Sequence, residues 1–136
     1  MSELRIKAIK ENLDEVLMFI DGELEKLDCS MKVQMQIDLS VEEIFINIAS
    51  YAYFPDTGMA FISFESENGG STVLISFTDT GVPYNPLEKE DPDITLTSEE
   101  RQVGGLGIFL VKKNMDEVYY KYENGNNVLT MKKKIK

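Results

Sequence analysis

The chain has 136 residues, and its 24 acidic side chains outnumber its 14 basic ones, which leaves a net charge of −10 at pH 7. This acidity disfavours binding to nucleic acid and to anionic membrane surfaces, because both carry negative charge. Histidine is absent and Cys29 is the single cysteine, which excludes Ser-His-Asp triads, His-ligated metals, zinc–thiolate sites and an internal disulfide.

Length and composition predict one globular domain over residues 1–136. Apolar residues make up 43% of the chain, and no apolar run approaches the ~18 residues that a membrane span needs. The N-terminus lacks the apolar core of a signal peptide, and a single thiol fits a reducing compartment. We therefore expect a cytoplasmic protein.

The first half of the chain predicts a strand followed by two helices. Residues 3–9 form the strand, and Asn12 or Asp14 would cap the helix after it. Apolar residues then recur at helical spacing, at Leu13, Val16, Leu17, Ile20, Leu24 and Leu27. A second helix over about 31–53 has a similar stripe at Ile37, Val41, Ile44, Phe45, Ile48 and Ala52.

The second half predicts two hairpins with a long connection and a helix between them. The four strands are expected at 59–66, 71–79, 117–123 and 127–135, with Asn-Gly turns in both hairpins. Residues 80–103 break the pattern, as a functional lid or a disordered segment does, and a helix follows at 104–115. The predicted fold is α+β, a two-layer sandwich of a mixed, mostly antiparallel sheet with helices on one face. The lysines at 132–134 predict a protected edge strand.

Glu43, Asn47 and Tyr51 form one row on the second predicted helix, at the rim of its apolar stripe. A carboxylate and an amide oxygen in such a row can bind Mg²⁺ or orient a nucleophile. The alternative is a solvated helix flank.

Asp79 ends a strand and shares its parity with Val73, Ile75 and Phe77. Alternation therefore points its carboxylate inward, where it needs a polar partner such as a nucleobase amino group. Gly81 lets the chain reverse and lets a flat ring approach closely. A plain turn is the alternative for both residues.

Gly104-Gly105-Leu106-Gly107 precedes an apolar helix. Glycines at a helix start expose backbone N–H groups, which together with the helix dipole bind phosphate. The spacing matches neither a Walker P-loop nor a Rossmann fingerprint, and a flexible hinge is the alternative.

Taken in order, these motifs resemble those of the Bergerat-fold (GHKL) superfamily of gyrase, MutL and histidine kinase ATP-binding domains. Glu43-x-x-x-Asn47 resembles its N-box, Asp79-x-Gly81-x-Pro83 its first glycine box and Gly104-Gly105-Leu106-Gly107 its second. The small size and the run Gly-Gly-Leu-Gly-Ile-x-Leu-Val at 104–111 look like the stand-alone anti-sigma-factor serine kinase branch.

The resemblance implies ATP and Mg²⁺ as cofactors. Asn47 would ligate the Mg²⁺ that bridges the phosphates, and Glu43 would be the general base toward the attacking hydroxyl. Asp79 would accept a hydrogen bond from the adenine amino group, with Gly81 packed near the ring.

The resemblance also implies that Gly105, Leu106 and Gly107 bind the phosphates through their backbone, beneath a lid over about 82–103. Independently of the resemblance, the place of Arg101 just before the glycines suggests that it reaches the γ-phosphate or a phosphorylated product, and Asn127 in the last hairpin is a candidate for holding the adenine side. Many superfamily members have histidine one turn after the N-box asparagine, where this chain has Tyr51.

The function implied is an ATP-dependent protein-serine kinase that phosphorylates a small anti-anti-sigma protein and binds a sigma factor or similar regulator. A homodimer is compatible with the sequence, which does not determine the oligomeric state. Two alternatives remain: a non-catalytic nucleotide-sensing partner-switch module, and a fragment of a gyrase- or MutL-type ATPase. Gyrase- and MutL-type ATPases normally have a further domain that supplies a lysine to the γ-phosphate. We expect a single domain here, which argues against the second alternative.

Overall fold

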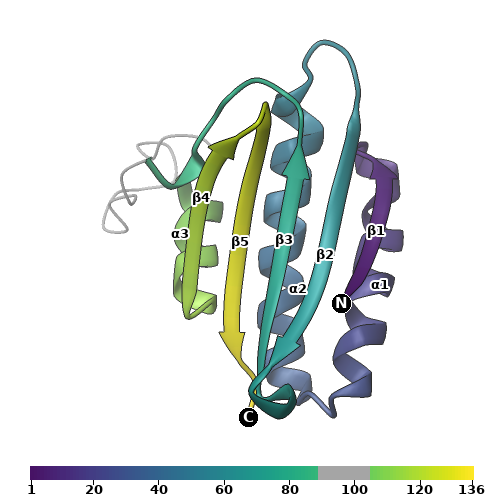
Figure 1. The fold of residues 1–136 in the computed structure, drawn as a ribbon, viewed down its shortest axis with the longest axis vertical. Helices are drawn as coiled ribbons and strands as arrows, with labels where there is room; N and C mark the ends of the chain where they lie inside the picture. Colours follow the sequence, from purple (N-terminus) through teal and green to yellow (C-terminus); the bar gives the residue numbers. More distant parts are fainter. Residues whose placement is uncertain (89–104) are drawn as a thin grey trace.

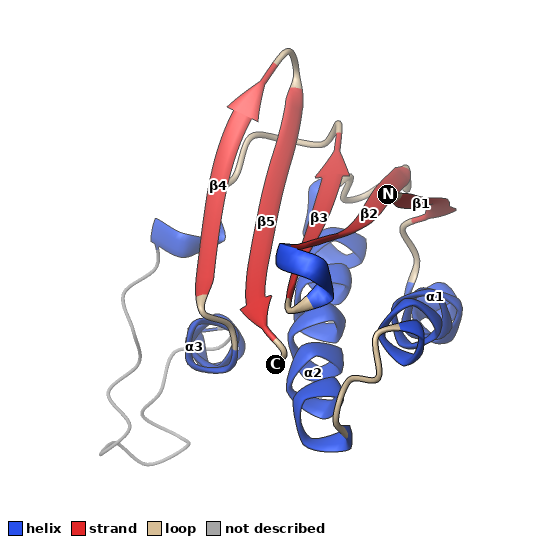
Figure 2. Ribbon diagram, turned by 60° about the horizontal axis from the view of Figure 1, so that its bottom comes forward, coloured by secondary structure: helices blue, strands red, loops and turns tan. Residues whose placement is uncertain are grey.

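The computed structural model describes residues 1–88 and 105–136, which form one sheet with helices on one of its faces (Figures 1 and 2). The main elements are β1 (Ser2–Lys7), α1 (Leu13–Lys26), α2 (Met31–Asn47), β2 (Met59–Glu67), β3 (Thr72–Asp79), α3 (Gly105–Asn114), β4 (Glu117–Glu123) and β5 (Asn126–Lys134). The α+β sandwich and the predicted order of its elements are confirmed.

The strands lie in the order β1-β2-β3-β5-β4, and every neighbouring pair is antiparallel. The mixed sheet that we expected therefore has no parallel pair among the described strands. β5 pairs with β3 as well as with β4 of its own hairpin, and this pairing sets Asn127 opposite Asp79. The register thus brings together two polar residues that are 48 positions apart.

The core lies between the sheet and the helix layer. Alternate strand residues point inward and are buried, among them Ile6, Ala60, Ile62, Phe64, Val73, Ile75, Phe77, Leu129 and Met131. The helices bury the stripes predicted for them, with Val16, Ile20 and Leu24 from α1 and Ile37, Val41, Ile44 and Phe45 from α2. No helix among the described residues is long and apolar enough to cross a membrane.

The second helix ends differently from the prediction of one helix to residue 53. Its α-helical part stops at Asn47, and a π-helical turn (Ile48–Ala52) follows. A π-helical turn contains an extra residue, so it alters the phase of the side chains and the direction of the carbonyl groups. The Ala52 carbonyl accepts a hydrogen bond from the Val82 N–H at 3.0 Å. The turn thereby joins the end of α2 to the loop after β3.

Two smaller predictions are wrong. Asn12 does sit at the N-cap of α1, but its side chain donates to the Lys7 carbonyl at 2.9 Å and makes no cap bond, and Asp14 lies inside the helix. The lysines at 132–134 lie on an interior strand, where Lys132 forms ion pairs with Glu67 and Glu117 at 3.2 and 3.6 Å. Electrostatic pairing across the sheet therefore replaces the edge protection that we expected.

Part of the predicted lid lies outside the described residues. Residues 82–88 are described and end in a 3₁₀ turn (Pro86–Glu88), whereas 89–103 are not described. Arg101 and Gly104 likewise lie outside the described part of the chain.

Candidate functional site

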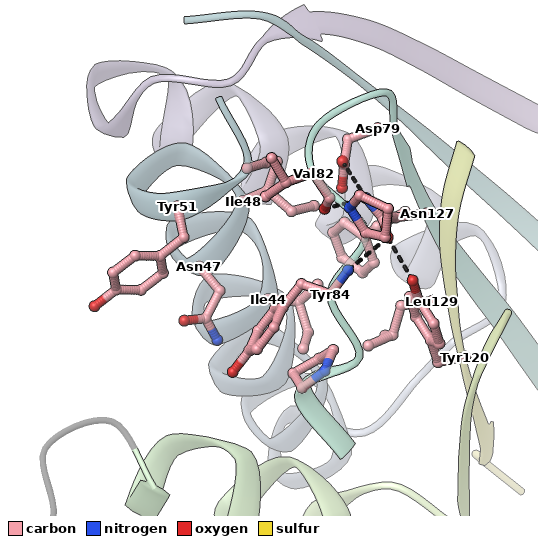
Figure 3. Close-up of a pocket in the computed structure, with 14 residues that line it drawn as sticks. Ile44, Asn47, Ile48, Tyr51, Asp79, Val82, Tyr84, Tyr120, Asn127 and Leu129 are labelled. Carbon is pink, nitrogen blue, oxygen red and sulfur yellow. Dashed lines mark hydrogen bonds between the residues drawn. The ribbon is translucent and has the colours of Figure 1, made fainter. Parts of the chain in front are cut away.

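A cavity of about 480 Å³ opens between the end of α2 and the inner face of β3, β5 and β4 (Figure 3). Its helix side consists of Ile44, Asn47, Ile48, Tyr51 and Ala52. The sheet contributes Phe77, Asp79, Tyr120, Asn127 and Leu129, and the loop after β3 contributes Val82, Pro83, Tyr84 and Pro86. A cavity of this size, mostly apolar with a few fixed polar groups, is typical of a small-molecule site.

Asp79 is the buried carboxylate of this cavity. It closes β3, and its residue is only 5% exposed, so the predicted inward orientation is confirmed. Its Oδ1 accepts hydrogen bonds from the Gly81 N–H and from Asn127 Nδ2, both at 2.9 Å. No donor among residues 1–88 and 105–136 bonds to Oδ2. Asp79 therefore stabilises the predicted turn through Gly81 and is also the predicted inward-facing acceptor.

Gly81 lies against the π-helical turn. A Cβ atom at this position would overlap the backbone carbonyl of Ala52, so only glycine lets the loop cross the helix end this closely. The hydroxyl of Tyr53 also holds the start of the loop after β3. It accepts a hydrogen bond from the Thr80 N–H at 3.0 Å and donates to the Met59 carbonyl of β2 at 2.6 Å. Gly81 thereby fixes the loop that walls the cavity.

Glu43 and Asn47 form the predicted acid–amide pair on α2. Asn47 Nδ2 donates to Glu43 Oε1 at 3.3 Å, and both side chains are half-buried, whereas Glu42 is exposed. This hydrogen bond fixes the amide, since its nitrogen faces Glu43 and its oxygen is directed elsewhere. The structure thus supports Glu43 rather than its neighbour as the acid of the pair.

The second glycine motif meets this pair. α3 begins at Gly105, so Gly105, Leu106 and Gly107 are its first three residues. A Cβ atom at Gly107 would overlap the Glu43 carboxylate, which shows how closely α3 packs against α2 at this point. Two motifs that lie far apart in the sequence therefore meet at one site.

Asn127 has a larger role than the sequence indicated. Its side chain is buried and bonds to Asp79, to the loop after β3 and to Tyr120 of β4. Burial raises the pKa of the Tyr120 hydroxyl, with the charge of Asp79 acting in the same direction, so this group stays protonated and donates to Asn127. The parity that Asn127 shares with the inward residues Leu129 and Met131 is the signal that could have revealed it.

Tyr51, which we expected in the row with Glu43 and Asn47, falls in the π-helical turn and is 60% exposed. It nevertheless lines the same cavity as Asn47 (Figure 3). The widened turn, rather than regular helical spacing, places it there.

The polar groups fit Mg²⁺ only with help from a ligand. The described residues contain no cluster of three or more acidic, cysteine or histidine side chains that could hold a metal ion. Mg²⁺ is commonly bound by one or two protein oxygens together with phosphate and water. The hard amide oxygen of Asn47 suits that arrangement.

Comparison with known proteins identifies the family of this chain. The histidine kinase-like ATPase domain family matches residues 6–133. The fold is that of this class, and the chain belongs to the family.

Among curated relatives, the serine/threonine-protein kinase BtrW of Bordetella bronchiseptica is 26% identical over 102 residues, which cover 75% of this chain and 71% of that protein. The serine-protein kinase RsbW of Bacillus thuringiensis is 22% identical over 132 residues, covering 96% and 82% of the two chains.

Solved structures show the same fold. The RsbU and RsbW domains of Rv1364c from Mycobacterium tuberculosis superpose with a TM-score of 0.64 at 14% identity. The match covers 99% of this chain and 33% of that longer one. The catalytic domain of the histidine kinase ThkA gives a TM-score of 0.52 at 14% identity, with 99% and 98% coverage.

Proposed function

We propose that this chain is an ATP-dependent protein-serine kinase of the anti-sigma-factor type. The observation that carries the proposal is the meeting of Glu43, Asn47 and Gly107 beside a cavity that contains the buried carboxylate of Asp79. Within the histidine kinase-like ATPase family, the relatives BtrW and RsbW are named serine/threonine- and serine-protein kinases, and their sequences match this chain over most of their length.

In this proposal Asp79 selects adenine. Oδ1 is held by two donors, which leaves Oδ2 to accept a hydrogen bond from the exocyclic amino group of the base. The apolar side chains of Ile48, Val82 and Leu129 would contact the faces of the ring. Gly81 acts indirectly, by keeping the loop close to α2.

The phosphates would lie at the start of α3, where the N–H groups of Gly105, Leu106 and Gly107 carry the positive end of the helix dipole. Asn47 would hold a divalent ion, for which we propose Mg²⁺, and such an ion supplies neutralisation of phosphate charge when bound.

Glu43 would be the catalytic base. Its carboxylate takes the proton from the serine hydroxyl as the oxygen–phosphorus bond to the γ-phosphate forms and the bond to the β-phosphate oxygen breaks, releasing ADP. Asn47 and Gly107 keep the carboxylate in position, by a hydrogen bond and by close packing. Phosphoryl transfer depends mainly on such positioning.

We propose as the phosphoacceptor a serine on a small anti-anti-sigma protein, with a sigma factor or similar regulator as the second partner. The names of the RsbW and BtrW relatives support the kinase part of this proposal. We also propose a cytoplasmic location, where ATP and sigma factors are found. Homodimerisation stays a prediction.

The substitution Glu43→Gln tests the kinase proposal. Glutamine keeps an oxygen that can accept from Asn47, so ATP affinity should change little, whereas loss of the base should slow phosphotransfer by roughly 10²–10⁴-fold. The assay follows transfer of labelled γ-phosphate to a purified anti-anti-sigma protein from the same genome, with its acceptor serine replaced by alanine as a blank.

Glu42→Gln is the matched control, since it removes the same charge from the exposed neighbouring position. It should leave transfer unchanged. If wild-type protein binds ATP but phosphorylates no such partner, the non-catalytic nucleotide-sensing switch replaces the kinase proposal.

A further inference from the structure

We propose that Asn127 is a positioning residue that sets the orientation of the Asp79 carboxylate and the adjoining cavity wall, so that the site's preference for adenine depends on it. This inference rests on the proposed function, because it concerns the same nucleotide site. Asn127 lies at the start of β5, opposite Asp79 on β3, and its residue is 6% exposed.

The Asn127 amide makes all the hydrogen bonds that it can make. Nδ2 donates to Asp79 Oδ1 at 2.9 Å and to the Val82 carbonyl at 3.0 Å, with the Gly81 carbonyl further away at 3.4 Å. Oδ1 accepts from the Tyr84 N–H at 3.1 Å and from the Tyr120 hydroxyl. Acceptors surround the nitrogen and donors surround the oxygen, so only one orientation of the amide satisfies the network.

This network determines which oxygen of Asp79 faces a ligand. Asn127 and Gly81 both bond to Oδ1, and together they prevent the carboxylate from turning. Without the amide, Oδ1 keeps only the Gly81 N–H, and the two oxygens can exchange places. An acceptor that is free to turn gives a weaker and less selective bond to a nucleobase.

The same amide holds the loop after β3, which walls the cavity. Val82 and Tyr84 line the cavity, and Asn127 bonds to the carbonyl of the first and the N–H of the second (Figure 3). Tyr120 adds β4 to the network through its hydroxyl. The Asn127 side chain therefore connects the strands on the sheet side of the cavity to the loop after β3.

The test compares Asn127→Asp with the control Asn126→Asp. The control adds the same charge one residue earlier, where strand alternation turns the side chain to the opposite face of β5. Binding of ATP and of inosine triphosphate, which lacks the amino group, is measured calorimetrically with Mg²⁺ at about pH 6 and about pH 8. Circular dichroism confirms that each variant is folded.

At the higher pH, Asn127→Asp places two carboxylates at hydrogen-bonding distance and removes the donor to Asp79. We expect ATP affinity to fall by roughly tenfold to a hundredfold and the preference for ATP over inosine triphosphate to disappear. At the lower pH the two carboxyls share a proton, which restores a donor to Asp79 Oδ1, so affinity and preference should largely recover. A role in folding alone would not produce recovery of base preference with pH.

Tyr120→Phe provides a second, milder variant that keeps the ring and removes one donor to Asn127. We expect it to weaken ATP binding by about threefold to tenfold and to reduce the base preference. This variant decides the question if Asn127→Asp does not fold.

The proposal is overturned if Asn127→Asp keeps the wild-type base preference at both pH values, if its loss is equal at both, or if Asn126→Asp has the same effect. It is also overturned if Tyr120→Phe, tested because Asn127→Asp does not fold, binds like wild type. Failure of wild-type protein to bind ATP would instead refute the proposed function itself. The wild-type titration in the same series separates these outcomes.

Discussion

Two glycines show that the same residue type serves different purposes at this site. At Gly81 an added Cβ would meet the backbone of Ala52, which cannot move without displacing the helix end. At Gly107 it would meet the carboxylate of Glu43, which is the far end of a flexible side chain. Gly81 is therefore required for the close packing of the loop on α2, whereas Gly107 leaves room for the Glu43 carboxylate at its position.

Substitution by alanine should separate these roles. Gly81→Ala should lower the free energy of unfolding by about 1–3 kcal/mol, the usual cost of overpacking a stiff position. Gly107→Ala should change it by less than about 1 kcal/mol, because the Glu43 side chain can move aside. Urea unfolding monitored by circular dichroism measures both.

Although Gly107→Ala should change stability little, it should slow phosphotransfer at least about tenfold, because a displaced Glu43 no longer reaches the hydroxyl. Equal stability losses in the two variants, or full activity in Gly107→Ala, would contradict the packing described for α2 and α3.

Much of the residue-scale site could be predicted, and the part that could not has a clear physical reason. Glu43 and Asn47 are neighbours on one helix, and the orientation of Asp79 follows from alternation along one strand. The network around Asn127 instead depends on β3 pairing with β5, which is long-range in sequence. Local patterns specify faces, but they do not specify which strands pair.

At the scale of elements, α1 and α2 share a half-buried pair of acids, Asp21 and Asp38. The Oδ1 atom of each is buried and accepts no hydrogen bond from a donor group of the described residues, so a bond between the two acids requires a proton on one of them. Burial, followed by the hydrogen bond and the charge of Asp21, raises the pKa of Asp38 to about 8. Burial and the charge of Asp38 also raise the pKa of the nearby Cys29 thiol.

This pair should make stability depend on pH. Because the folded pKa of Asp38 lies above the unfolded value of about 4, the folded state binds the proton more tightly. Its contribution to stability is fully present below about pH 4 and is lost as the pH rises to about 8. We expect Tm to fall between about pH 4 and pH 8, and Asp38→Asn to reduce this fall, because the amide can donate to Asp21 without a proton to lose.

Thermal unfolding followed by circular dichroism across this range tests the prediction, with Asp28→Asn as a control at an exposed acid. A wild-type Tm that stays level, or an equal effect of the control, would show that the two helices do not share a proton.

Helices and strands were predictable to within a few residues because their apolar periodicity is strong, whereas their ends were not. The π-helical turn after Asn47 depends on the Val82 N–H, which bonds to the Ala52 carbonyl from a distant loop. Asn12 bonds to the carbonyl of Lys7, the last residue of β1, across the short connection to α1. A tertiary contact decides the first case, and the shape of a short connection decides the second.

At the scale of the whole molecule, the sheet topology gathers the site at one edge of the helix layer. The C-terminal end of β3, the start of β5 and the end of α2 meet there, and α3 packs alongside α2 (Figures 1 and 2). The fold class could be predicted from hairpin signals and helix stripes. The insertion of β5 between β3 and β4 could not, although it is what places Asn127 opposite Asp79.

The central claim is that the cavity around Asp79 binds ATP with a divalent ion. Calorimetric titration of wild-type protein and Asp79→Asn with ATP, each with and without Mg²⁺, tests it most directly. We predict Mg²⁺-dependent binding to wild type, and affinity at least about tenfold weaker in Asp79→Asn, because the amide presents a donor where the base needs an acceptor. Equal affinity in both proteins, or no binding of wild type at millimolar ATP, would contradict the account.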